Sequence, residues 1–265
     1  MSSRDCAMLA KYCEFGDARR RMALNTLVLL PGLDGSGRLF ADFLSALPPS
    51  LRTIIASYPT HRFLSYSELL PCVGDVIPSA EPFVLLAESF SSPLAVMFAA
   101  RHPANLAGLV VCAGFVTNPI RTWSLSFLAR LLSRPLLFRL PPSEFMLERF
   151  LIGADAPVAL RVDVCQTLRC VGPSVLARRV HAVLDCDVRP DLTRVDVPFL
   201  YIQAAEDRLV RAECFEEVQR LKPSTILAPI SAPHFVLQRQ PHRAAQIIVG
   251  FIQHLAFDEG ARPGR

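Results

Sequence analysis

Residues 83–97 place a serine between an apolar run and a helical run, and this stretch most constrains what the chain can fold into. Phe83 to Ala87 is apolar and of strand length, Ser89 follows it, and the residues after Ser89 are typical of a helix. A strand, a tight turn and a helix with a serine at the apex hold the hydroxyl out of the edge of a sheet. A neutral serine hydroxyl is a poor nucleophile, so it needs a base, an acid that orients the base, and donors for a developing oxyanion. If Ser89 is reactive, the rest of the chain must supply these groups.

The composition is that of a protein with a large core. Of the 265 residues 51% are hydrophobic, and the mean hydropathy of +0.33 argues against disorder and predicts some exposed apolar surface, such as a substrate mouth. The net charge of +4 rests on arginines scattered among acids, with Lys11 and Lys222 as the only lysines. No basic block alternates with aromatic residues, so nucleic-acid binding is not expected.

The eight cysteines are spread irregularly, and they form no CxxC pair and no Cys/His spacing of a metal site. We therefore expect reduced thiols in a cytoplasmic protein. A serine nucleophile with a base and oxyanion donors also calls for no metal and no organic cofactor.

Residues 1–22 are predicted to form an N-terminal tail. Arg19 to Arg21 and the apolar run after them imitate a signal peptide, but that run ends at Pro31 without a good cleavage site. No run reaches the roughly 18–20 apolar residues of a membrane span, so no transmembrane segment is expected.

Apolar runs alternate with helical patterns at the spacing of a parallel, doubly wound sheet. The pattern predicts about six strands, at 26–30, 52–57, 83–87, 106–113, 197–203 and 224–227. Helices are predicted between them, at 38–47, 65–77, 91–102, 212–221 and 244–255. Ser65 and Glu68 form a capping box at the start of the second of these helices. The expected core therefore comprises residues 23–115 and 195–265.

Residues 116–194 have a different pattern, which predicts a helical cap inserted into the core. Helices are expected at 123–132, 143–151, 158–168 and 174–184, with little strand signal. The arginines of its first part indicate an amphipathic lid helix with solvated charges, and a membrane-surface segment is the alternative. Trp123 and Phe127 are candidate substrate contacts, although such aromatic residues could equally form the core of the insertion.

Candidates for the base and the acid follow the last two predicted strands. His234 lies in the loop after the final strand, where its side chain can reach the carboxyl edge of the sheet. The other five histidines fit surface or structural positions better. Asp207 directly follows the strand 197–203, and Glu206 is its competitor in the same loop. Asp34 and Glu88 also flank the important loops, where each is expected to act only as a cap.

The order of serine, acid and histidine resembles the α/β-hydrolase superfamily, whose nucleophile lies in a Gly-x-Ser-x-Gly elbow. The resemblance assigns Ser89 as the nucleophile, Asp207 rather than Glu206 as the acid, and His234 as the base. The glycine-rich turn at 31–35 resembles the superfamily's oxyanion loop, with proline in place of the usual histidine. This match implies that the backbone N–H groups of Leu33 and Phe90 form the oxyanion hole.

The resemblance covers residues 24–256, with some departures. Ala87 and Ser91 stand where the superfamily has its elbow glycines, and Ser91 and Ser92 are rival hydroxyls that we expect to point away from the apex. The superfamily often begins with two further strands, which the polar N-terminus is not expected to supply. The insertion falls where family members carry a helical cap.

The resemblance implies a serine esterase that hydrolyses a small carboxylic ester with an apolar acyl or aromatic group. A thioesterase that acts on acyl-CoA or acyl-carrier substrates is the first alternative, and a carbon–carbon hydrolase or lyase is the second. A non-catalytic binding protein with the same fold is the alternative from a different class. The sequence does not predict an oligomeric state.

Overall fold

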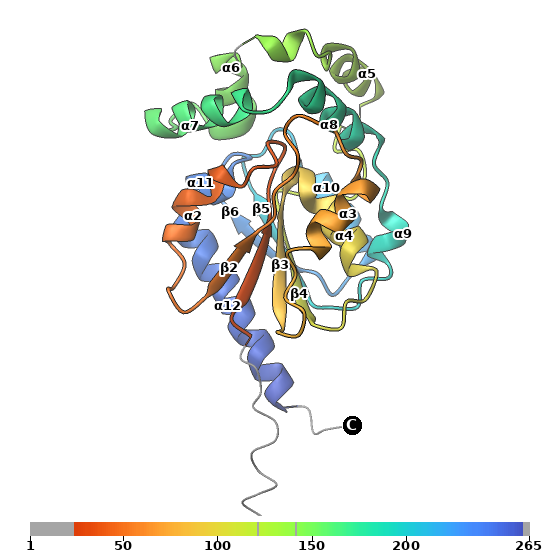
Figure 1. Cartoon of the computed structure of the whole chain (residues 1–265), viewed down its shortest axis with the longest axis vertical. Helices are drawn as coiled ribbons and strands as arrows, with labels where there is room; N and C mark the ends of the chain where they lie inside the picture. Colours follow the sequence, from red (N-terminus) through yellow and green to blue (C-terminus); the bar gives the residue numbers. More distant parts are fainter. Residues whose placement is uncertain (1–23, 121, 141, 262–265) are drawn as a thin grey trace, which may run out of the picture.

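The computed structural model describes residues 24–120, 122–140 and 142–261, so the predicted tail at 1–22 lies outside the described residues. Six parallel strands form one sheet in the order β2-β1-β3-β4-β5-β6 (Figure 1). The predicted doubly wound sheet is confirmed, and every predicted strand forms. Their bounds are β1 Thr26–Leu30, β2 Arg52–Ile55, β3 Phe83–Glu88, β4 Leu106–Cys112, β5 Phe199–Ala204 and β6 Ile226–Ile230.

The apolar strands are those that the helices cover on both faces. Every residue of β1 and β3 is buried, because both strands lie inside the sheet. The outer strands β2 and β6 are partly exposed, and Ile226 and Leu227 of β6 reach the surface. A parallel sheet between two helical layers predicts this distribution.

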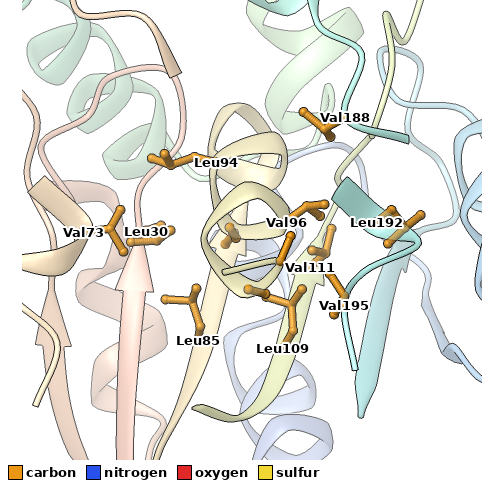
Figure 2. Close-up of a cluster of buried hydrophobic side chains, with 14 of the residues drawn as sticks. Leu30, Val73, Leu85, Leu94, Val96, Leu109, Val111, Val188, Leu192 and Val195 are labelled. Atoms are coloured by element: carbon orange, nitrogen blue, oxygen red, sulfur yellow. The ribbon is translucent and has the colours of Figure 1, made fainter. Parts of the chain in front are cut away.

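One hydrophobic cluster fills the face of the sheet toward α3 (Tyr66–Gly74) and α4 (Ser92–Ala99). Figure 2 shows members of this cluster: Leu85 and Leu109 from the strands, and Leu94 and Val96 from α4. Burying each such aliphatic side chain contributes about 1.5–3 kcal/mol before the loss of conformational entropy is counted. The predicted capping box of Ser65 and Glu68 is present, and it fixes the start of α3.

A second cluster fills the opposite face. It is formed by η1 (Arg38–Phe40), α2 (Ala41–Ser45), α11 (Val236–Arg239) and α12 (Pro241–Ala261) against the strands. The amphipathic helix α10 (Ala212–Leu221) packs by Phe215 and Val218 on the first face. The two clusters hold the sheet rigid, so the loops at its carboxyl edge start from fixed points.

The chain between β4 and β5 is helical. Figure 1 shows α5, α6, α7 and α8 as a layer across one end of the sheet. Two backbone hydrogen bonds tie this layer to the loops beneath it: Phe235 N donates to Leu151 O at 2.9 Å, and Gly172 N donates to Thr60 O at 2.7 Å. The bounds are α5 Trp123–Leu132, η3 Leu137–Arg139, α6 Glu144–Met146, the π-helix η4 Leu147–Ile152, α7 Val158–Arg169, α8 Pro173–Asp185 and α9 Arg189–Leu192.

The last of these helices belongs to the layer beside the sheet. Leu192 of α9 is fully buried in the first cluster, near α4 and α10. The predicted cap at 116–194 thus ends in a helix that packs beside the sheet, and its assignment as a separate unit stays a prediction. Among the helices in the described ranges, none has the length and apolar character needed to cross a bilayer.

Candidate active site

Ser89 lies at the carboxyl end of β3, where the strand passes through η2 (Ser89–Ser91) into α4. Its φ angle is +47°, a left-handed conformation that is uncommon for residues other than glycine. Strain of this kind persists only where the surrounding structure enforces it, and it is concentrated at functional sites. Ser89 is partly exposed, whereas Phe90 and Ser91 are buried. Of these three residues, only Ser89 therefore reaches the surface.

The rival hydroxyls of Ser91 and Ser92 point into the protein, as predicted. The Ser91 hydroxyl donates to the carbonyl of Pro31 and lies 2.7 Å from the Tyr58 hydroxyl. Ser92 Oγ is buried, and a Cβ atom added at Gly114 would lie 2.1 Å from it. Both serines are thus packing residues of the turn.

His234 joins Ser89 to Asp207. Its Nε2 atom lies 2.8 Å from Ser89 Oγ, and its Nδ1 atom lies 2.6 Å from Asp207 Oδ2. The other Asp207 oxygen accepts from the backbone N–H groups of Leu209 and Val210, at 2.8 and 2.9 Å. The competitor Glu206 turns away and accepts from the Ser231 hydroxyl at 2.6 Å. The three residues chosen from the sequence are therefore brought together, and Asp207 rather than Glu206 lies against the histidine.

Electrostatics favour the protonated form of His234. Burial by itself lowers the pKa of this imidazole, but the negative charge of Asp207 and the hydrogen bond to it outweigh burial, so the pKa of His234 is raised. The side chains of His234 and Asp207 are 5% and 1% exposed, which leaves the attraction between them poorly screened. A proton accepted on Nε2 is thus stabilised within the group.

The glycine turn after β1 lies beside this site. Leu30 is paired with Ala87, so the turn that starts at Pro31 leaves the sheet next to Glu88 and Ser89. Gly35 has a φ angle of +70°, and its N–H closes the turn by donating to Gly32 O at 3.0 Å. Leu33, in this turn, and Phe90, after Ser89, therefore flank the serine from two adjacent strands. Their role as oxyanion donors stays a prediction.

Asp34 and Glu88 were both interpreted as caps, and only Asp34 makes capping hydrogen bonds. Its carboxylate accepts from Ser36 N at 2.8 Å and from the Ser36 hydroxyl at 2.5 Å, and so closes the glycine turn. Glu88 makes no capping hydrogen bond. It is buried, and it accepts from Gln238 Nε2 at 2.9 Å. Burial raises the pKa of Glu88 to about 7.

The remaining histidines are not part of the group formed by Ser89, Asp207 and His234. The two candidate substrate contacts differ in how much of them the structure describes. His102 pairs with Asp196 at 3.0 Å on the surface. Phe127 is 56% exposed on α5, whereas the side chain of Trp123 lies outside the described residues. Within the described ranges, no group of three or more His, Cys, Asp or Glu residues is placed to hold a metal ion.

Comparison with solved structures identifies the architecture. The enol-lactonase from Burkholderia xenovorans LB400 superposes with a TM-score of 0.74 at 17% identity, covering 89% of this chain and 94% of that chain. An esterase from Exiguobacterium antarcticum gives a TM-score of 0.71 at 15% identity, covering 88% and 93%. The chain has the α/β-hydrolase fold.

In this α/β-hydrolase fold the serine, the acid and the histidine follow β3, β5 and β6, which is the order that the resemblance predicted. Among curated proteins, the pimeloyl-[acyl-carrier protein] methyl ester esterase of Neisseria meningitidis is 22% identical over 227 residues, covering 80% of this chain and 87% of that protein. No protein-family model matches the chain.

Proposed function

We propose that this protein is a serine hydrolase that cleaves carboxylic esters through an acyl-enzyme on Ser89. The observation that carries the proposal is the His234 imidazole, with Ser89 Oγ at 2.8 Å on one side and Asp207 Oδ2 at 2.6 Å on the other. Its surroundings suit a base, because Asp207 stabilises the imidazolium that forms when His234 accepts a proton.

The first half of the reaction forms the acyl-enzyme. Ser89 Oγ attacks the ester carbonyl carbon while its proton passes to His234 Nε2. The carbonyl oxygen becomes an oxyanion, to which the N–H groups of Leu33 and Phe90 donate. When this intermediate collapses, the bond to the alcohol oxygen breaks, and the leaving alcohol takes the proton from His234.

The second half releases the acid. A water molecule gives a proton to His234 Nε2 and attacks the acyl carbon. The bond between that carbon and Ser89 Oγ then breaks, and the serine oxygen recovers the proton. No electron acceptor or further group takes part in either half.

An apolar acyl or aromatic group suits the exposed apolar surface of the helical layer. Between α5 and α6 several large apolar side chains are 53–69% exposed, among them Leu125, Leu132, Leu136 and Phe145. Apolar exposure on this scale is typical of a surface that contacts a ligand or partner. A small ester with an apolar acyl group is therefore the substrate class we propose.

A carrier-bound acyl substrate is the second candidate. The curated relative from N. meningitidis is named for a methyl ester on an acyl-carrier protein. The same serine chemistry would cleave either an ester or a thioester of such a substrate, because both have an acyl carbon open to attack.

The test combines labelling with turnover. A fluorophosphonate should label Ser89, and p-nitrophenyl esters should be hydrolysed by the wild type but not by Ser89→Ala or His234→Ala. Activity on free esters, compared with activity on acyl-CoA thioesters and on esters and thioesters bound to an acyl-carrier protein, then separates the two candidates. If the wild-type protein is neither labelled nor active over the whole chain-length range, it is not a serine hydrolase, and the non-catalytic alternative is favoured.

A further inference from the structure

Arg179 is a buried cation that the proposed chemistry does not use. It lies on α8, in the helical layer, and is 1% exposed, whereas the adjacent Arg178 is on the surface over the Phe63 ring. A buried guanidinium is costly unless its N–H groups find acceptors. Such a group therefore marks a place where the chain needs several hydrogen bonds at once.

The acceptors of Arg179 are carbonyls of the glycine turn after β1 and of the loop after β2. Nη1 donates to Leu33 O at 2.8 Å and to Asp34 O at 2.9 Å. Nη2 donates to Pro59 O at 3.0 Å. One guanidinium thus ties the glycine turn to the loop after β2. A lysine cannot reproduce this, because its ammonium is a single centre on a flexible stem, whereas guanidinium is a planar fork.

The same group also contacts the turn after Ser89. Its central carbon lies 5.7 Å from the centre of the Phe90 ring and 5.8 Å from that of Tyr58, within the range of cation–π attraction. Leu33 and Phe90 are the residues whose backbone N–H groups are the proposed oxyanion donors. Arg179 therefore touches both of them, one through its carbonyl and the other through its ring.

The glycine turn leaves room for this guanidinium. A Cβ atom added at Gly35 would lie 2.7 Å from Arg179 Nη1 and 2.8 Å from Nη2. Gly37 lies two residues later in the same turn and is also left-handed. A Cβ atom added there would instead lie 2.4 Å from the Ile55 side chain. These two glycines therefore form a matched pair, of which only Gly35 borders Arg179.

We propose that Arg179 is a positioning residue of the oxyanion hole, which fixes the Leu33 and Phe90 turns from the helical layer. This inference rests on the proposed function. Arg179 holds the carbonyls of Leu33 and Asp34, and so fixes the two peptides that follow Leu33. The Leu33 N–H shares its peptide with the Gly32 carbonyl, which accepts from Gly35 N within the same turn. By fixing this turn, Arg179 keeps the Leu33 N–H in its direction before substrate arrives. Donors aligned in advance act mainly on the transition state, and losing one costs about 10²–10³-fold in kcat.

A purely structural role makes a different prediction. If Arg179 only anchors α8 to the core, its replacement lowers stability or loosens substrate binding and leaves kcat intact. If it positions the donors, kcat falls while KM changes little, since the interaction is stronger in the transition state than in the ground state. The division between kcat and KM therefore separates the two roles.

The test compares Arg179→Lys with Arg178→Lys on p-nitrophenyl esters. We expect kcat to fall about 10–100-fold in Arg179→Lys, with KM within about threefold of wild type, and no change in Arg178→Lys. Hydrogen–deuterium exchange of the peptide covering residues 30–37 should be faster only in Arg179→Lys. An unchanged kcat, or a change confined to KM and thermal stability, overturns the proposal.

A second pair keeps the proposal testable if Arg179→Lys does not fold. Gly35→Ala, which displaces the guanidinium, should lower kcat more than Gly37→Ala at equal loss of stability. Equal effects of the two overturn the proposal. The exchange measurement needs no turnover. If the wild type is inactive, the proposed esterase is overturned. If exchange is still faster in Arg179→Lys, the inference that Arg179 fixes the turn is supported independently.

Discussion

Asp207 Oδ2 lies 2.6 Å from His234 Nδ1, and both side chains are almost fully buried. The other oxygen of the carboxylate is held by two backbone N–H groups, so Asp207 cannot rotate without breaking them. This contact raises the pKa of His234 against the lowering effect of burial. It also directs the opposite ring nitrogen toward Ser89, because the position of Nδ1 determines where Nε2 points.

Replacing Asp207 by asparagine should therefore remove most activity. Asparagine carries no charge to stabilise the imidazolium, and its amide can favour the wrong tautomer, so kcat should fall about 10³–10⁴-fold. The pKa of His234 should fall as well, which moves the acid limb of the pH profile of kcat/KM to lower pH. The matched control is Glu206→Gln in the same loop, which should stay active. Comparable losses in both variants would contradict the assignment of Asp207.

Glu88 makes stability depend on pH in a predictable direction. Burial raises the pKa of Glu88 to about 7 in the folded protein, whereas an unperturbed glutamate titrates near 4.3. Between these values the folded state holds a proton that the unfolded state has lost. The contribution of Glu88 to the free energy of unfolding is therefore complete below about pH 4.3 and is lost as the pH rises toward 7, by about 4 kcal/mol in total.

Glu88→Gln should remove this dependence. Glutamine is neutral at every pH and keeps an oxygen that can accept from Gln238, so the variant should gain about 3 kcal/mol relative to wild type between pH 5 and pH 8. Urea unfolding at four pH values measures the gain. Glu81→Gln, the same substitution at an exposed glutamate, provides the control. A flat difference for Glu88→Gln would show that Glu88 ionises normally.

Ser91 is predicted to matter for stability and not for chemistry. Burial raises the pKa of Tyr58, which keeps its hydroxyl protonated, so it can donate to Ser91 while Ser91 donates to Pro31 O. Ser91→Ala should cost about 1–3 kcal/mol, the usual penalty for stranding a buried polar partner. A double-mutant cycle with Tyr58→Phe should show coupling between the two side chains. Fluorophosphonate labelling should persist in Ser91→Ala, and its loss would point to Ser91 as the nucleophile.

The sheet was predictable because its strands are short apolar runs with clear ends. β1 forms at the predicted residues, 26–30. β6 was expected at 224–227 and forms at Ile226–Ile230, and it includes Pro229, which an edge strand tolerates. The convergence of Ser89, Asp207 and His234 was predictable for a simple reason: parallel strands place their carboxyl ends at one edge.

Residues whose role depends on docking could not be found in this way. Arg178 and Arg179 are identical neighbours in the sequence, and only the packing of α8 buries one and exposes the other. Glu88 did carry a signal, since it is the one charged residue at the end of a fully apolar strand. Its position before a helix suggested that Glu88 acts as a helix cap. In the structure its carboxylate is buried and makes no capping hydrogen bond.

Phe127 tests whether the helical layer contacts substrate. Its ring is 56% exposed on α5, so replacing it should cost the fold little. If it meets the acyl chain, Phe127→Ala should lower kcat/KM for octanoate esters more than for acetate esters, because burying each CH₂ group is worth about 0.8 kcal/mol. The control is Leu227→Ala, an exposed apolar residue on β6, which should lower neither. A chain-length profile that is the same in Phe127→Ala and wild type would remove Phe127 from the substrate site and assign it to the outer surface of the layer.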